Sequence, residues 1–174
     1  MTRAQLTWTR ILVALVVVGI SIYIYSLRDQ ADKLAVYGYP GIFILSFLAY
    51  ATVFLPAPGL AIIATMGAVF NPFLVALVAA SGATLGEVAG YLAGFSGQML
   101  AERVDIYDRL TIWMRRNGPL TVYLLAAIPN PFFDIAGVIA GVLKMSLLTF
   151  LVSCWLGETT KMLAFAFLGF QLLK

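Results

Sequence analysis

Histidine is absent from the sequence, and cysteine occurs only once. None of the 174 residues is histidine, which excludes Ser-His catalytic triads, zinc sites with histidine ligands and histidine proton shuttles. The single cysteine, Cys154, has no second cysteine with which to form an internal disulfide. It lies in an apolar segment, where its simplest interpretation is a small buried hydrophobic residue. We therefore expect no metal site and no cofactor.

Charge is also scarce. Only 11% of the residues are charged, 62% are hydrophobic, and the mean hydropathy is +0.98, whereas a soluble domain needs far more polar surface. We predict an all-α integral membrane protein, because backbone groups in lipid must be satisfied within helices. The net charge of +3 is small, and no basic run with interleaved aromatics predicts nucleic-acid binding. Anionic lipid head groups are the more natural partner for the few cations.

The N-terminal segment, residues 1–40, is predicted to hold a transmembrane helix followed by an interfacial stretch. Arg3 and Arg10 precede an apolar run over residues 11–27. The run is longer than the hydrophobic region of a typical signal peptide, and "RDQADK" follows it in place of a small-residue cleavage site. An uncleaved first helix is therefore expected.

Apolar runs and helix breakers divide residues 41–174 into two similar halves. The first half, residues 41–96, has apolar runs at 41–55, 60–70 and 73–95. The second half, residues 119–174, has runs at 119–128, 135–142 and 146–173. Between the halves, residues 97–118 combine arginines and acids with apolar residues at helical spacing. This pattern predicts an amphipathic connecting helix on the membrane surface, although a solvated connector would also fit.

Each half begins with two short runs that meet at a proline-containing turn. The turn residues are Pro56 and Pro58 in the first half and Pro129 and Pro131 in the second. A helix rises 1.5 Å per residue, so a short run does not cross about 30 Å of hydrocarbon. Two such runs folded back on each other form a re-entrant hairpin, which membranes tolerate where protein or water surrounds it. We therefore expect one re-entrant hairpin in each half, followed by one transmembrane helix.

The two halves also share short motifs, which predict an internal repeat. "PAP" beginning at Pro56 corresponds to "PNP" beginning at Pro129, and "LGE" ending at Glu87 corresponds to "LGE" ending at Glu158. A re-entrant hairpin leaves the chain on the side of the membrane where it started, and the helix that follows carries it to the other side. The second half then starts on the opposite side from the first, so the halves are inverted copies, as in transporters with a binding site near the midplane. If residues 41–55 cross the bilayer instead, the inversion is lost.

Three stretches together resemble the DedA family, also called the VTT-domain or SNARE-associated Golgi family. They are "LPAPGLAIIATMGAVFNP", "GATLGEVAGYLAG" and "IPNPFFDIAGVIAGVLKMSLLTFLVSCWLGE", and the resemblance covers roughly residues 41–170. It implies facing re-entrant hairpins in an inverted repeat. It also implies the movement of lipids across a bilayer, with polyprenyl-phosphate carriers among bacterial members and phospholipid scramblases among eukaryotic ones.

The second hairpin departs from many bacterial members of that family. Those members carry arginines around the hairpin turn, whereas this chain offers Asn130 and Asp134. The "PNPFFD" sequence is closest to one bacterial branch and also resembles the "PNW" form of the eukaryotic scramblases. From the bacterial resemblance we expect a protein of the cytoplasmic membrane of a prokaryote. Asn130 and Asp134 are therefore candidates for the substrate or proton site, and the alternative role of Asp134 is to cap the short helix that follows.

Ionisable residues inside apolar segments are the main candidates for a substrate or proton site. Glu158 and Lys161 are three residues apart and so share a helix face, where they either neutralise each other or face a hydrated cavity. An isolated acid such as Glu87 must face the bundle interior, be protonated or find a partner. Glycines recur beside it every four residues, which predicts close packing of backbones or substrate at Gly82, Gly86 and Gly90.

These features favour a lipid transporter, either a flippase or a scramblase. Lys161 would attract a lipid phosphate or alternate between acids, so protons could drive the cycle. The GxxxxGK[ST] motif of nucleotide-binding loops does not occur in the sequence. We therefore expect any driving force to be a gradient of lipid, protons or another ion. Because the chain is short, a homodimer is plausible. The alternatives are an intramembrane enzyme that uses Glu87, Asp134 and Glu158, which the lack of histidine disfavours, and a non-catalytic membrane scaffold.

Overall fold

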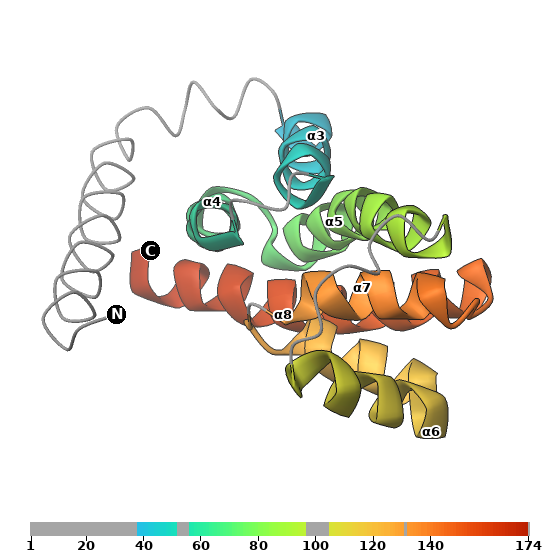
Figure 1. Ribbon diagram of the computed structural model, residues 1–174. Helices are drawn as coiled ribbons and strands as arrows, with labels where there is room; N and C mark the ends of the chain where they lie inside the picture. The colour runs from blue at the N-terminus through green and yellow to red at the C-terminus, as the bar shows by residue number, and fades with distance from the viewer. Residues whose placement is uncertain (1–37, 52–55, 97–104, 131, 174) are drawn as a thin grey trace, which may run out of the picture.

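The computed structural model describes residues 38–51, 56–96, 105–130 and 132–173, and in these residues the only regular elements are helices. The predicted N-terminal helix, the first part of the connecting helix and Pro131 lie outside the described residues. Figure 1 shows the helices stacked around the longest one, α8. In chain order they are α3 (Gly38–Ala51), α4 (Pro56–Val69), α5 (Pro72–Phe95), α6 (Asp105–Ala127), α7 (Phe133–Val142) and α8 (Leu147–Leu173).

Helices α5 and α8 are long and apolar enough to cross a membrane. They have 24 and 27 residues, which correspond to lengths of roughly 36 and 40 Å. The two helices pack against each other and run in opposite directions. Near the middle, Trp155 Nε1 donates to Ser81 Oγ over 3.1 Å, while the Tyr91 ring near the end of α5 stacks on Phe150 near the start of α8.

The remaining helices pack on this pair in a crosswise pattern. Helix α3 packs mainly on α5 and α6 on α8, whereas α4 packs mainly on α8 and α7 on α5. The first helix of each half, α3 or α6, therefore contacts the membrane-length helix of its own half, and the second, α4 or α7, contacts that of the other half. This exchange joins the two halves into one unit.

Glycines allow close backbone approach at these contacts. A Cβ atom at Gly86 would lie 2.7 Å from the backbone nitrogen of Ala51 on α3. At the corresponding glycine of the second half, Gly157, a Cβ would lie 2.5 Å from the carbonyl oxygen of Tyr123 on α6. Side chains larger than hydrogen are therefore excluded at equivalent places in both halves.

The structure refines the predicted boundary between the connecting helix and the second half. Residues 97–118 and 119–128 were expected to be separate elements, and α6 (Asp105–Ala127) consists of two helical pieces that meet at a break next to this boundary. It bends at Asn117, whose φ of −154° and ψ of 71° are not helical, and Pro119 follows inside the helix. Proline removes one helical hydrogen bond and clashes with the preceding turn, so the break coincides with the predicted boundary.

The prolines named as turn residues fall at different places in the structure. Pro56 and Pro58 lie in the first turn of α4, which begins four residues before the apolar run expected from residue 60. The first turn tolerates proline because its N–H groups have no helical partner. Pro129 lies in the non-helical segment between α6 and α7.

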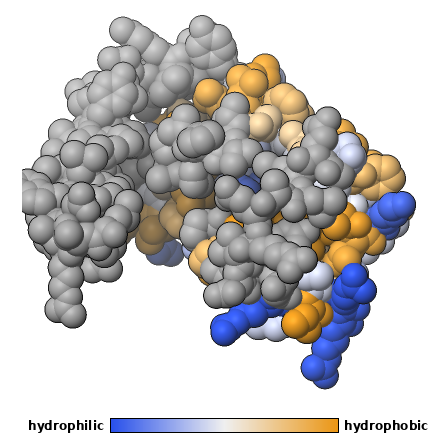
Figure 2. Space-filling model, in the orientation of Figure 1, coloured by the Kyte–Doolittle hydropathy of each residue, from blue (hydrophilic) through white to orange (hydrophobic). Residues whose placement is uncertain are grey.

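The core consists of two apolar clusters at opposite ends of the long helices. One surrounds Phe150 and Ile139 and joins α5, α6, α7 and α8, and the other surrounds Val75 and Met162 and joins α3, α4, α5 and α8. Many large apolar side chains are exposed on the outside, such as Leu148 at 73% and Phe73 at 52%. Figure 2 shows hydrophobic residues over much of the described surface. An apolar exterior of this kind suits lipid as the solvent.

Candidate polar site between the long helices

A buried ion pair lies on α8 at the junction of the two apolar clusters. Lys161 Nζ donates to Glu158 Oε1 over 2.7 Å, with Glu158 fully buried and Lys161 6% exposed. The spacing of three residues places both side chains on one helix face, as the sequence predicts. Few charged side chains are buried to this extent without a functional or structural reason.

Two aromatic rings complete the surroundings of the ammonium group. Lys161 Nζ lies 5.2 Å from the ring centroid of Tyr50 on α3 and 5.8 Å from that of Phe133 on α7. Both distances are within the range of a cation–π attraction. The ammonium therefore lies where α3, α7 and α8 meet, between elements of both halves.

Helix α5 contributes Glu87, which is 3% exposed. A Cβ atom added at Gly137 on α7 would lie 3.7 Å from Glu87 Oε2, so α7 passes directly beside the carboxyl group. Asp134, Glu158 and Lys161 are close enough to interact with Glu87 electrostatically. The structure thus brings Glu87 into the neighbourhood of the ion pair, although the residues are far apart in the sequence.

Half-buried Asp134 lies in the first turn of α7 and adds a third acid to this neighbourhood. Its side chain does not cap the helix, since the cap position is Phe132 and has no side-chain hydrogen bond. The carboxylate still benefits from the positive end of the α7 dipole. Three acids against one cation leave up to two negative charges uncompensated, which a proton or another cation can balance.

Several buried oxygen atoms in this region have no hydrogen-bond partner among the described residues. They are Glu87 Oε1 and Glu158 Oε2 in the site and Oγ1 of Thr159, which follows Glu158 in the sequence. Thr84 on α5 lies beside the Cys154 thiol and interacts with it. Buried polar atoms in proteins are normally hydrogen-bonded, so each such atom needs an explanation. The two carboxyl oxygens can therefore each accept or carry a proton without breaking a hydrogen bond to the described residues.

Asn130 occupies a different position from these acids. Its Nδ2 donates to the carbonyl oxygens of Leu125 and Ile128 over 2.7 and 2.6 Å, and its Oδ1 accepts from the N–H of Phe132 over 2.9 Å. Both ends of the amide are thus occupied by the α6–α7 connection. The structure places Asn130 in the turn as a local brace.

Only some of the regularly spaced glycines of α5 lie against a neighbouring backbone. A Cβ atom at Gly82 would clash with the Phe43 carbonyl oxygen on α3, and Gly86 lies against the same helix. A Cβ atom added at Gly90 would have the carbonyl oxygen of Asp134 as its nearest neighbour, at an ordinary contact distance of 3.8 Å. Gly82 and Gly86 therefore permit close packing, whereas Gly90 leaves room beside the acids.

Sequence reasoning missed Tyr50, Phe133 and Thr84 as neighbours of the site. Thr84 precedes Glu87 by three residues on the same helix, so helical spacing was a signal that could have identified it. No comparable signal marks Tyr50 or Phe133, because each reaches Lys161 only through tertiary packing. Among the described residues, no group of three or more His, Cys, Asp or Glu side chains is arranged to hold a metal ion.

Comparison with known families gives one match. The family model described as the VTT domain matches residues 55–171, a range that begins just before α4 and ends within α8 and so includes Glu87, Asp134, Glu158 and Lys161. No curated protein and no solved structure matches the chain.

Proposed function

This chain belongs to the VTT domain family, whose members are membrane proteins generally thought to be transporters or flippases, and we propose that it moves lipids between the two leaflets of a bilayer. The proposed substrates are phospholipids or polyprenyl-phosphate lipids. The proposed action is that of a flippase or scramblase, in which the head group passes through the protein while the tails stay in the membrane.

The observation that carries the proposal is the buried Glu158–Lys161 pair beside Glu87. Desolvation of two charges costs several kcal/mol per ion, and their attraction offsets this only partly. An apolar pair of similar volume would be a simpler way to fill the same space. Retention of charged groups between two membrane-crossing helices supports a role in binding a polar group there.

The crosswise packing supports an inverted repeat with two re-entrant hairpins. Helix α4, with 14 residues, and α7, with 10 residues, are roughly 21 and 15 Å long, too short to cross about 30 Å of hydrocarbon. Each packs on the long helix of the opposite half. The antiparallel direction of α5 and α8 agrees with halves that are inverted copies, with the polar site between them.

In the proposed cycle, Lys161 exchanges partners. The ammonium leaves Glu158 to bind the phosphate of a lipid head group, and returns when the lipid departs. The surrounding acids, Glu87 and Asp134, repel the phosphate and so prevent it from binding too tightly. Uptake of a proton by one of these acids would remove that repulsion, which is how a proton gradient can drive the movement.

We place the protein in the cytoplasmic membrane of a prokaryote, with membrane lipids as its partners and no cofactor. A homodimer is part of the proposal, because two short chains can complete a pathway that one chain forms only in part. The proposal assigns binding and movement to the acids and Lys161, and no chemical step.

The test is leaflet exchange in liposomes that contain the purified full chain and a trace of fluorescent lipid. A membrane-impermeant reductant bleaches the outer leaflet, so exchange appears as bleaching beyond about half of the signal. We expect extended bleaching with a phospholipid probe, a polyprenyl-phosphate probe or both. Bleaching equal to that of protein-free vesicles for both probes would contradict the proposal and favour a scaffold. Chemical conversion of either lipid would favour an enzyme.

A further inference from the structure

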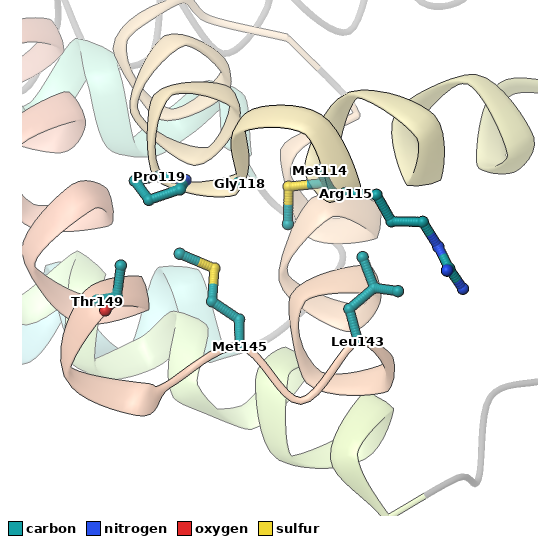
Figure 3. Close-up of a pocket in the computed structure, with 7 residues that line it drawn as sticks. All are labelled: Met114, Arg115, Gly118, Pro119, Leu143, Met145 and Thr149. Atoms are coloured by element: carbon teal, nitrogen blue, oxygen red, sulfur yellow. The ribbon is translucent and has the colours of Figure 1, made fainter.

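A cavity lies away from the polar site, at the bend of α6. It has a volume of about 440 Å³. Figure 3 shows Met114 and Arg115 on α6, Leu143 and Met145 on the α7–α8 connection, and Thr149 on α8 around it. None of these residues belongs to the Glu87–Lys161 neighbourhood, so the cavity is a separate feature of the fold.

The backbone around this cavity is held in an irregular form. On one side, α6 bends at Asn117. On the other, Lys144 has a φ of 53°, a left-handed value that is uncommon for a residue other than glycine. The α7–α8 connection is fixed by Tyr91, whose hydroxyl donates to the Met145 carbonyl oxygen over 2.6 Å. Two separate backbone irregularities thus border the cavity.

The cavity combines an apolar interior with Arg115 at its edge, and Lys144 stands between two of its lining residues in the sequence. Met114, which is 5% exposed, and half-buried Leu143 and Met145 supply flexible apolar surface. Figure 3 shows the Arg115 side chain extending outward from the wall. Arg116 and Lys144 are exposed nearby in the sequence, and none of these three cations forms an ion pair within the part of the chain that the structure describes. The edge is therefore suited to a negatively charged group.

The surface next to the cavity has the features of a membrane–water interface. Trp113 and Ile112 are 60% and 64% exposed and precede the exposed pair Arg115 and Arg116. Figure 2 shows hydrophilic and hydrophobic side chains next to each other around the lower part of the molecule, where α6 lies. Tryptophan beside arginine on an exposed helix is typical of the head-group region, where aromatic rings and cations both find favourable surroundings.

We propose that this cavity binds an anionic phospholipid. The upper part of the acyl chains lies against Met114, Leu143 and Met145, and the charged head group lies at the edge, near Arg115 and Lys144. An apolar cavity selects an amphipathic molecule, and the exposed cations select one with net negative charge. This is a resident lipid site at the surface, in addition to the pathway between α5 and α8.

The test measures how phosphatidylglycerol and phosphatidylcholine stabilise the purified full chain in detergent. A lipid that binds the folded state raises the melting temperature with its concentration, which gives an apparent Kd. We expect phosphatidylglycerol to stabilise the protein and phosphatidylcholine to do so much less. Replacement of both cations in Arg115→Gln/Lys144→Gln should weaken the apparent Kd for phosphatidylglycerol by roughly tenfold or more, since each cation near a membrane surface contributes on the order of a fivefold change.

Two further variants distinguish the cavity from general charge effects. Arg109→Gln removes an exposed arginine of the same helix that does not line the cavity, so its Kd should match the wild type. Gly118→Leu adds a side chain toward Met145, whose Sδ atom lies 3.5 Å from the position of the new Cβ, and should weaken binding by filling the space. Equal stabilisation by both lipids, or equal weakening in Arg109→Gln, would overturn the proposal. Stabilisation by a polyprenyl phosphate alone would also overturn it. None of these readouts depends on lipid transport.

Discussion

At the scale of single residues, the Glu158–Lys161 pair is the part of the site that the sequence predicted most directly. The spacing of three residues predicts a shared face, and the 2.7 Å contact shows the pair formed. For Glu87 we expected an interior position, protonation or a partner, and its side chain is buried. The role of Asn130 was not predictable in the same way, because its two carbonyl partners depend on how α6 ends. The contact of Tyr50 with Lys161 crosses more than a hundred residues of sequence and leaves no local pattern.

Removal of the cation alone should destabilise the protein strongly. Lys161→Met leaves Glu158 buried without its partner, which is expected to cost about 3–5 kcal/mol. The double variant Glu158→Gln/Lys161→Met removes both charges and should recover much of that loss. The measurement is the free energy of unfolding in a denaturing detergent. If the single and double variants are equally unstable, the pair is not a coupled buried ion pair.

At the scale of helices, the long elements were easier to predict than the short ones. The runs at 73–95 and 146–173 correspond to α5 and α8 within one residue at each end, because length and composition dominate for membrane-crossing helices. The α4 start was placed four residues too late, since proline was treated as a breaker where it begins a helix. The break in α6 at Asn117 lies within two residues of the boundary expected before Pro119. The proline predicted where the regular helix is interrupted, but not that the two pieces follow each other directly.

Glycines on α5 provide a matched test of helix packing. Gly94→Ala would place a Cβ atom against the Val138 backbone on α7, so we expect a loss of about 1–3 kcal/mol from overpacking. Gly90→Ala is the control, because its nearest such atom is 3.8 Å away, and it should leave stability unchanged or slightly improved. Unfolding of the purified variants in denaturing detergent gives both values. Equal losses would show that this contact does not limit the approach of α7.

At the scale of the whole molecule, the packing of α4 on α8 and of α7 on α5 could not be predicted from the sequence. The repeated "LGE" motif predicted equivalent positions, and Gly86 and Gly157 do occupy similar contacts on α3 and α6. Which long helix each short helix joins depends on tertiary packing. The family match reaches residues 55–171 and so includes most of both halves.

The proposed inverted repeat predicts that corresponding junctions lie on opposite sides of the membrane. Asn71 precedes α5 and Ser146 precedes α8, and both are exposed. In a Cys154→Ala background, Asn71→Cys and Ser146→Cys should react with a membrane-impermeant maleimide from opposite sides of oriented vesicles. The parent Cys154→Ala protein, which lacks any thiol, is the control for background labelling. Labelling of both junctions from the same side would contradict the inversion.

The most direct test of the whole account is the rate of leaflet exchange in Glu87→Gln, measured against the wild type and Leu85→Ala. Glutamine keeps the shape of the buried side chain and removes its charge and its proton exchange, whereas Leu85 is an exposed neighbour on α5. At equal amounts of folded, reconstituted protein, we expect lipid exchange in Glu87→Gln to be at least tenfold slower than in the wild type, which corresponds to a barrier change of about 1.4 kcal/mol or more. Leu85→Ala should exchange lipid at a rate near that of the wild type. Wild-type exchange in Glu87→Gln would contradict the claim that the buried polar site carries the lipid.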